Sequence, residues 1–257
     1  MQNEIIINTL LQKWPKNTVA VYSWLKENGV SRYLAGYYRQ SGWLDSFGVG
    51  AFIRRGDNVN EFGAVFTLQN YLKLPVHIGG LSALNLQGLS HYLREEFVTQ
   101  IFNKYKSPIP SWFKKSKSFK VKIYNTNFLL IDKHLVMKQD VGFHQLKISS
   151  PERAILEVLY LCPDEFDLVE AFHLVENLVS LRPKVMQELL ENCNSIKVKR
   201  LACFMFEKAG HEWFKRLDLS KIDLGSGNRK IVERGVYDLK YKIIIPKDLK
   251  DGNNSTI

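Results

Sequence analysis

The sequence predicts an α+β fold. A winged helix-turn-helix at the N-terminus precedes a larger mixed α/β domain with a mainly antiparallel sheet and a helical subregion. Three observations lead to this prediction. Residues 18–55 have the order helix, glycine turn, helix and short strand pair. Four segments between residues 97 and 149 alternate polar with β-branched or aromatic residues. Helical periodicity returns between residues 151 and 209.

The length of 257 residues allows two domains. We expect a DNA-binding domain over residues 1–60, a helical connection packing on the C-terminal domain over 61–95, a basic α/β domain over 96–250 and a disordered tail over 251–257. No apolar run approaches the ~20 residues needed to cross a membrane. The three cysteines are an odd number in helical segments, which favours reduced thiols and a cytoplasmic protein.

The net charge of +10 favours a polyanionic partner. Residues 1–100 hold 9 Lys and Arg against 7 Asp and Glu, a surplus of 2. Residues 101–257 hold 27 against 19, a surplus of 8. Most of the excess positive charge therefore lies outside the predicted DNA-binding module.

The N-terminal module is predicted as three helices. The first covers residues 3–13 and stops before Pro15. The second starts from a cap at Asn17 or Thr18 and ends at Asn28, where Gly29 suits a left-handed turn. The third covers residues 32–41, and the hydroxyl of Ser31 can cap it.

The third helix carries the candidate DNA-binding residues. It would bury Leu34 and Tyr38 and expose side chains that suit base edges and phosphates, while Gly36 lets a backbone approach closely. The DNA-binding candidates are Ser31, Arg32, Tyr33, Tyr37, Arg39 and Gln40. The alternative is an ordinary amphipathic helix with two solvated arginines. The turn, the cap and the following strand pair favour DNA binding.

Short strands at residues 43–44 and 51–53 predict a wing. Arg54 and Arg55 follow as a basic tip or exit turn, suited to the minor groove or to phosphates, although a solvated hairpin end is the alternative. Next come a helix over 61–74, an extended piece at 77–78 and a short buried helix over 81–89. The glycine pair at residues 79–80 could hold an anion, but a structural turn is favoured because no phosphate-loop Lys-Ser/Thr follows.

Strands are predicted over residues 97–103, 119–125, 135–141 and 144–149. Seven lysines lie between residues 104 and 122, interleaved with Tyr105, Trp112 and Phe113. Such a pattern binds backbone phosphate and stacks exposed bases, although a solvated loop with a buried Trp is the alternative. The candidate backbone contacts from this segment are Lys114, Lys115 and Lys117.

A helix starts at Ser150-Pro151, and helices follow over residues 167–179, 183–193 and 196–209. The last begins with Lys197, Lys199 and Arg200, which oppose the helix dipole and are further candidate backbone contacts, or else a surface patch without a partner. Strands near 229–233 and 241–245 end the pattern. No zinc spacing, nucleotide-binding motif or catalytic signature occurs, so we expect no metal, no cofactor and no catalytic residues.

The chain resembles the AbiEi family of antitoxins from type IV toxin–antitoxin and phage-abortive-infection systems. The matching segments are GVSRYLAGYYRQSGWL, GGLSALNLQGLSHYL, SPERAILEVL and LDLGSGNRKIVERGVYDLKYKIIIP, within residues 5–247. The resemblance implies a winged-helix domain that represses its operon at operator DNA, expected to hold inverted repeats, and a C-terminal domain needed for antitoxicity and full repression. It also implies a neighbouring nucleotidyltransferase-like toxin that the antitoxin counters without a stable complex.

By position, the resemblance assigns recognition to Arg32, Tyr33, Arg39 and Gln40, and the wing to Arg54 and Arg55. Two other hypotheses stay open. In one, the basic C-terminal domain is the main nucleic-acid surface and binds RNA. In the other, that domain is an enzyme that reverses the toxin's modification, with residues 225–229 as the one sequence hint.

Overall fold

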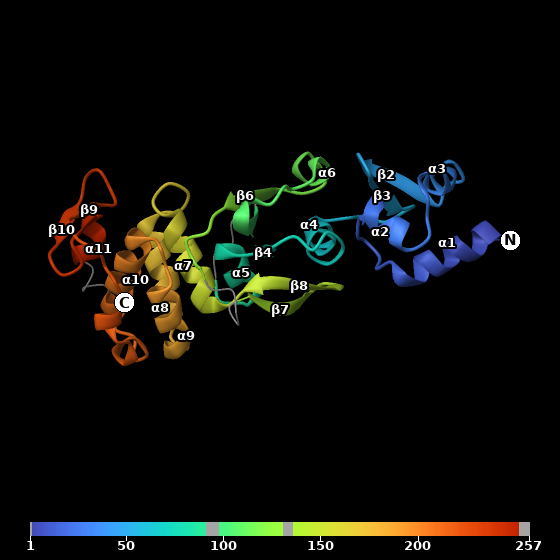
Figure 1. The fold of residues 1–257 in the computed structure, drawn as a ribbon. Helices are drawn as coiled ribbons and strands as arrows, with labels where there is room; N and C mark the ends of the chain where they lie inside the picture. The colour runs from blue at the N-terminus through green and yellow to red at the C-terminus, as the bar shows by residue number, and fades with distance from the viewer. Residues whose placement is uncertain (1, 91–97, 131–135, 252–257) are drawn as a thin grey trace. The chain divides into compact units, whose positions relative to one another are not determined.

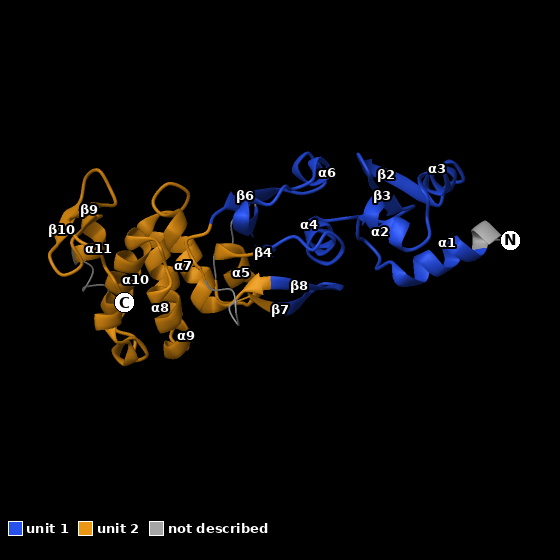
Figure 2. Ribbon diagram, in the orientation of Figure 1, with its two compact units in different colours: residues 1–77, 96–126, 138–147 blue, residues 78–95, 127–137, 148–257 orange. Residues whose placement is uncertain are grey.

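The computed structural model describes residues 2–90, 98–130 and 136–251 (Figure 1). They fall into two compact units, neither of which is one continuous segment (Figure 2). Unit 1 comprises residues 1–77, 96–126 and 138–147, and unit 2 comprises residues 78–95, 127–137 and 148–257. The continuous domains expected from the sequence stay predictions, and their tail from residue 252 onward lies outside the described residues.

Unit 1 begins with the element order of a winged helix-turn-helix. The elements are α1 (Gln2–Lys13), β1 (Ala20–Val21), α2 (Tyr22–Glu27), α3 (Arg32–Gln40), β2 (Leu44–Gly48) and β3 (Ala51–Arg54). The strands form a sheet of order β1-β3-β2. The second helix starts at Tyr22 rather than at residue 18, because Ala20 and Val21 pair with Phe52 and Ala51. The cap expected at Asn17 or Thr18 is therefore wrong.

The turn before α3 is the one that the sequence predicts. Gly29 is left-handed, with φ of 81°, and Val30 is fully buried. The Ser31 hydroxyl oxygen accepts a hydrogen bond from the Leu34 amide at 3.1 Å. The three helices close over one core that includes Trp14 and Tyr38. The glycine turn, the Ser31 cap and the packing of the core thus determine where α3 begins and which of its faces is exposed.

A helical segment that follows residue 60 packs against residues 17–19, just before β1. It consists of α4 (Glu61–Phe66) and the π-helical turn η1 (Thr67–Tyr71), so it ends three residues earlier than predicted. The Thr67 hydroxyl accepts from the Val19 amide at 3.2 Å and donates to the Val19 carbonyl at 2.6 Å. Gly63 has no room for a side chain, because a Cβ there would lie 1.9 Å from the Asn17 carbonyl oxygen.

A five-stranded sheet has the order β6-β5-β4-β8-β7. Its strands are β4 (Val76–Ile78), β5 (Thr99–Asn103), β6 (Val121–Asn125), β7 (Val136–Val141) and β8 (His144–Ser149). The pairs β4–β8 and β5–β6 are parallel, so the mainly antiparallel arrangement expected is wrong and the sheet is mixed. Parallel neighbours need a long crossover. The lysine-rich connection, with η2 (Lys104–Lys106) and α6 (Ser111–Lys114), is that crossover.

Unit 2 is mainly helical. Its helices are α5 (Gly80–Leu86), α7 (Pro151–Leu161), α8 (Leu168–Asn177), α9 (Pro183–Glu191) and α10 (Ile196–Lys208). Two short turns, η3 (Phe214–Arg216) and η4 (Leu219–Lys221), precede a small sheet of β9 (Arg229–Lys230), β10 (Val236–Asp238) and β11 (Ile243–Ile245), then α11 (Lys247–Asp251). Ser150 caps α7 as predicted.

The glycine pair before α5 faces an anion of the protein itself. The buried Glu157 carboxylate accepts from the Gly80 amide at 2.9 Å, from the Ser149 hydroxyl at 2.8 Å and from Arg153 Nε at 2.8 Å. The site that a phosphate would need is already filled. The predicted structural turn is confirmed.

Candidate nucleic-acid interface

Helix α3 has one buried and one exposed face. Leu34, Ala35 and Tyr38 are buried in the core of the winged module. Because a helix turns once in 3.6 residues, the centre of the opposite face is formed by Tyr33, Gly36 and Gln40. The flanking side chains, all exposed, are Arg32, Arg39 and Tyr37. Five of the six predicted recognition side chains therefore share one accessible surface, and the sixth, exposed Ser31, caps its N-terminal end.

Gly36 lies in the middle of this surface. A Cβ built at Gly36 has no atom of the described residues within 4 Å. Glycine inside a helix costs about 1 kcal/mol relative to alanine. The described part of the fold gives no reason for that cost. A bare patch on an exposed helix face instead allows a partner's backbone or base edge to come close.

The arginines on the flank of α3, Arg32 and Arg39, are available to bind an anion. The Arg32 guanidinium carbon lies 4.9 Å from the centre of the Tyr22 ring, which holds that side chain beside the helix start. Within the described residues neither Arg32 nor Arg39 pairs with a carboxylate. Both guanidinium groups thus keep their fork of donors for a base edge or a phosphate.

The β2–β3 hairpin places its tip at Val49-Gly50, far along the strands from the arginine pair. Arg54 pairs with Leu44 at the opposite end of the hairpin. Arg54 and Arg55 therefore lie at the exit turn, the second of the two positions expected from the sequence, and not at the tip. The strand β3 extends to Arg54, one residue further than predicted.

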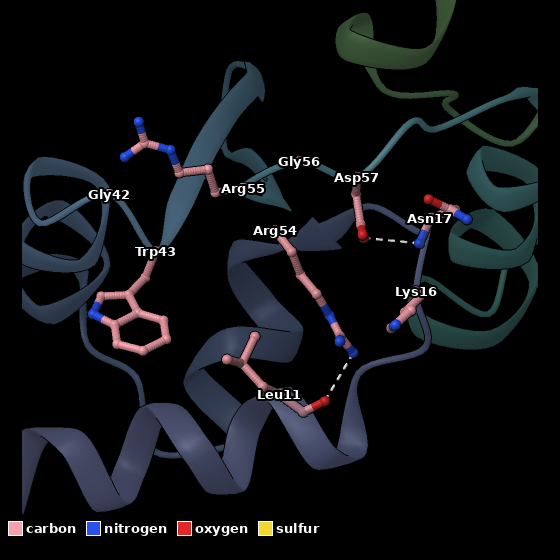
Figure 3. Close-up of a pocket in the computed structure, with 9 residues that line it drawn as sticks. All are labelled: Leu11, Lys16, Asn17, Gly42, Trp43, Arg54, Arg55, Gly56 and Asp57. Atoms are coloured by element: carbon pink, nitrogen blue, oxygen red, sulfur yellow. Dashed lines mark hydrogen bonds between the residues drawn. The ribbon is translucent and has the colours of Figure 1, made fainter.

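Arg54 serves the fold of the winged module. Its Nη2 donates to the Leu11 carbonyl at 2.8 Å, and its guanidinium lies 5.6 Å from the Trp14 ring centre. Burial lowers the pKa of this guanidinium. Figure 3 shows Arg54 pointing to Leu11 and Arg55 pointing away from it. Arg54 thus has a structural role through one of its donors, and its contact with DNA stays a prediction.

Arg55 extends the flank of α3 instead. Its guanidinium lies over Gly42, just beyond the helix, where a Cβ would come within 2.2 Å of Arg55 Nη1. It borders an open hollow of about 640 Å³. The lining residues are Leu11, Lys16, Asn17, Gly42, Trp43, Arg54, Arg55, Gly56 and Asp57 (Figure 3). Exposed Arg55 is therefore still a candidate for phosphate contact, from the C-terminal end of α3.

The lysine-rich crossover belongs to the same compact unit as the winged module. Lys114, Lys115 and Lys117 are exposed. Two of the three interleaved aromatics are not available for base stacking, since Trp112 is 5% exposed and Phe113 is 1% exposed, whereas Tyr105 is exposed. Trp112 packs edge-on against Phe47 of β2, with ring centres 6.0 Å apart. The buried tryptophan brings part of the surplus positive charge beside the wing.

The basic start of α10 is wrong as a nucleic-acid contact. Lys197 Nζ donates to the carbonyls of Tyr160 at 2.8 Å and Cys162 at 2.5 Å, and burial lowers its pKa. Lys199 is 4% exposed and Arg200 is 1% exposed. Both are inside the fold because α10 is buried almost all round.

Arg200 organises the loop before β9. It donates to four backbone carbonyls: Leu224 at 2.7 Å, Gly227 at 2.7 Å, Gly225 at 3.0 Å and Lys242 at 3.1 Å. The guanidinium thereby supplies the hydrogen-bond donors for the backbone carbonyls of this glycine-rich loop, which is not part of a β-sheet. The sequence signal for this role was the segment LGSG, whose carbonyls need a donor.

The cysteines and histidines of the described residues do not gather into a metal site. Burial raises the pKa of the Cys162 and Cys203 thiols to about 12, so they stay protonated, and all three cysteines are free and buried. The buried His211 is hydrogen-bonded to the Val175 carbonyl at 2.7 Å. No group of three His, Cys, Asp or Glu gathers as metal ligands within the described ranges. None of the helices in this part of the chain is long and apolar enough to span a bilayer.

Two family models match the chain, and both describe the same family. Residues 3–95 match the family model "Transcriptional regulator, AbiEi antitoxin N-terminal domain". Residues 96–246 match "Transcriptional regulator, AbiEi antitoxin, Type IV TA system". The crystal structure of the RV2827C protein from Mycobacterium tuberculosis has a similar fold, with a TM-score of 0.60 and 14% identity over 93% of this chain and 89% of that chain. No curated protein matches the sequence.

Proposed function

The chain belongs to the AbiEi family of transcriptional regulators, the antitoxins of type IV toxin–antitoxin systems, and from this premise we propose that it represses its own operon through α3. Membership of a transcriptional-regulator family implies binding to DNA. In the proposal, the exposed face of α3 enters the major groove of inverted repeats in the operator. Arg32, Arg39 and Gln40 contact base edges, while Tyr33 and Tyr37 contact phosphates.

The observation that carries this proposal is the composition of the exposed face of α3. A bare glycine lies at its centre and two unpaired arginines lie on its flank, while the opposite face is core. An amphipathic helix that only met water would gain stability from alanine in place of Gly36. The combination is typical of a helix that meets a closely approaching polyanion.

The test is a double substitution, Arg32→Ala with Arg39→Ala. Each base-reading arginine contributes about 1–3 kcal/mol of discrimination. The variant should therefore lose at least tenfold in affinity for a duplex carrying the promoter region of its own gene, and much less for an unrelated duplex. The control is Arg229→Ala with Arg234→Ala, which removes the same charge from exposed positions in unit 2. Operator binding as strong in the test variant as in the control would refute the role of α3.

We further propose that the chain counters a nucleotidyltransferase-like toxin encoded beside it, without forming a stable complex and without catalysis of its own. Co-expression should restore growth in cells that make the toxin, while the two proteins fail to co-purify. Toxin-modified substrate incubated with the pure protein should stay modified. Reversal of the modification would make the chain an enzyme and contradict this part of the proposal.

A further inference from the structure

A groove runs between the tip of the β2–β3 hairpin and the loop that contains α6. Residues 46–49 form one wall and residues 111–118 contribute the other. All of these residues belong to unit 1. The groove has a volume of about 430 Å³ and is open to solvent, so it suits a chain that passes across it better than an enclosed small molecule.

The contact between the two walls is specified by the sequence. Trp112 packs against Phe47 at the floor. A Cβ at Gly48 would lie 2.7 Å from Trp112 Cβ, so the hairpin can approach this closely only with glycine there. The register of β2 also shifts between Ser46 and Gly48, which bends the strand next to the contact. The strand end at Phe47-Gly48 is thus held against the crossover, next to the exposed hairpin tip.

The walls carry the chemistry of an anion site. The hairpin supplies the hydroxyl of Ser46, and the crossover supplies Ser111, Lys115, Ser116, Lys117 and Ser118. Among the residues that the structure describes, no carboxylate lines this groove, and neither Lys115 nor Lys117 has an ion pair. Lysine ammonium and serine hydroxyl groups are frequent contacts of DNA phosphates.

The burial of the aromatic residues decides which nucleic acid fits. Single strands are held by bases stacked on exposed rings. Trp112 and Phe113 are buried, and the half-buried Phe47 packs against Trp112, so the groove presents mainly charge and hydroxyls. A duplex presents only phosphate and sugar to such a surface. The exposed Val49 at the hairpin tip adjoins the same groove.

We propose that this groove binds the phosphate backbone of duplex DNA, so that the wing and the crossover hold one strand beside the bases that α3 contacts. The inference rests on the proposed function for its partner. It adds a separate, sequence-independent site from outside the helix-turn-helix. It also assigns a function to part of the surplus positive charge, which lies in the crossover and not on α3.

The test replaces Lys115 and Lys117 by Gln together, with Lys184→Gln plus Lys247→Gln as a control of equal charge change at exposed positions in unit 2. Full-length proteins are titrated with the promoter duplex and with an unrelated duplex of the same length at several salt concentrations. Each lost phosphate contact lowers the salt slope by about 0.9. The test variant should therefore lose roughly 1.8 from the slope on both duplexes, with its operator preference unchanged.

A second variant tests the groove without changing its lysines. Ser46→Asp puts a carboxylate on the hairpin wall opposite them and should weaken both duplexes alike. A lysine variant with the control's slope, or a Ser46→Asp variant that binds as wild type does, would overturn the groove. In a parallel titration with single-stranded RNA, a loss confined to the RNA and absent from both duplexes would also overturn it. Wild-type protein that binds both duplexes equally would instead overturn the proposed operator function and leave the groove standing.

Discussion

The substitution Gly36→Ala is expected to have opposite effects on the stability of the fold and on the affinity for DNA. Gly36 is inside α3, where alanine is the better helix former, and no described atom lies within 4 Å of the added methyl group. The substitution also reduces the freedom of the unfolded chain. Together these effects should raise stability by about 0.4–1 kcal/mol. For a chain of this size that corresponds to a rise of about 1–4 °C in melting temperature.

The same methyl group should harm DNA binding. It stands at the centre of the exposed face, between Tyr33 and Gln40, where the proposed interface is closest. An extra methyl in a well-packed contact costs about 1–3 kcal/mol. Since 1.4 kcal/mol is a factor of ten, operator affinity should fall by about 5- to 150-fold. Stability and affinity are thus expected to move in opposite directions.

Thermal melting and operator titration of the same protein preparation provide the assay. Gly63→Ala is the control, because its Cβ would collide with the Asn17 carbonyl oxygen and should lower the melting temperature instead. A Gly36→Ala protein that is more stable and binds the operator as tightly as wild type would refute the close approach at α3. A loss of stability would refute the helical reasoning itself.

Three further predictions concern the support of the fold and of α3. Arg200→Lys should destabilise unit 2 by about 1–3 kcal/mol in urea unfolding, because backbone carbonyls bonded to this buried side chain lose their donors, while Arg229→Lys should be neutral. Ser31→Ala should cost about 1 kcal/mol of stability, whereas Ser31→Asp should keep the cap but lower operator affinity through charge repulsion. Burial lowers the pKa of His144. As the pH falls below about 6.5, this side chain therefore binds a proton more readily in the unfolded chain than in the folded one. Stability should therefore decline with falling pH over that window, and urea midpoints of His144→Gln should decline less.

The α10 residues show why charge alone was a poor guide to the site. Lys197, Lys199 and Arg200 read as a basic patch, yet their donors meet backbone carbonyls or their side chains are buried. Sequence periodicity cannot distinguish a solvated cation from one that bonds a distant loop, because the partner lies 24 or more residues away. The bond of Arg54 to α1 could not be read from the sequence for the same reason, since its acceptor, the Leu11 carbonyl, is distant in the chain.

Local interactions explain what the sequence by itself determined. The glycine turn, the Ser31 cap and the buried positions of α3 all depend on residues within one or two turns of each other, so their pattern predicted both the helix and its exposed face. The Ser150 cap of α7 is another example. The family could also be identified from motifs spread along the chain.

Only the tertiary structure decided where the remaining positive charge lies. The parallel pairing of β5 with β6 turned residues 104–120 into a crossover, and Trp112 docked that crossover on the wing. Strand partners and their direction depend on contacts between distant segments, which hydrophobic alternation does not encode. The sequence therefore specified the helix proposed to recognise DNA, and the packing of distant segments placed Lys115 and Lys117 beside the wing.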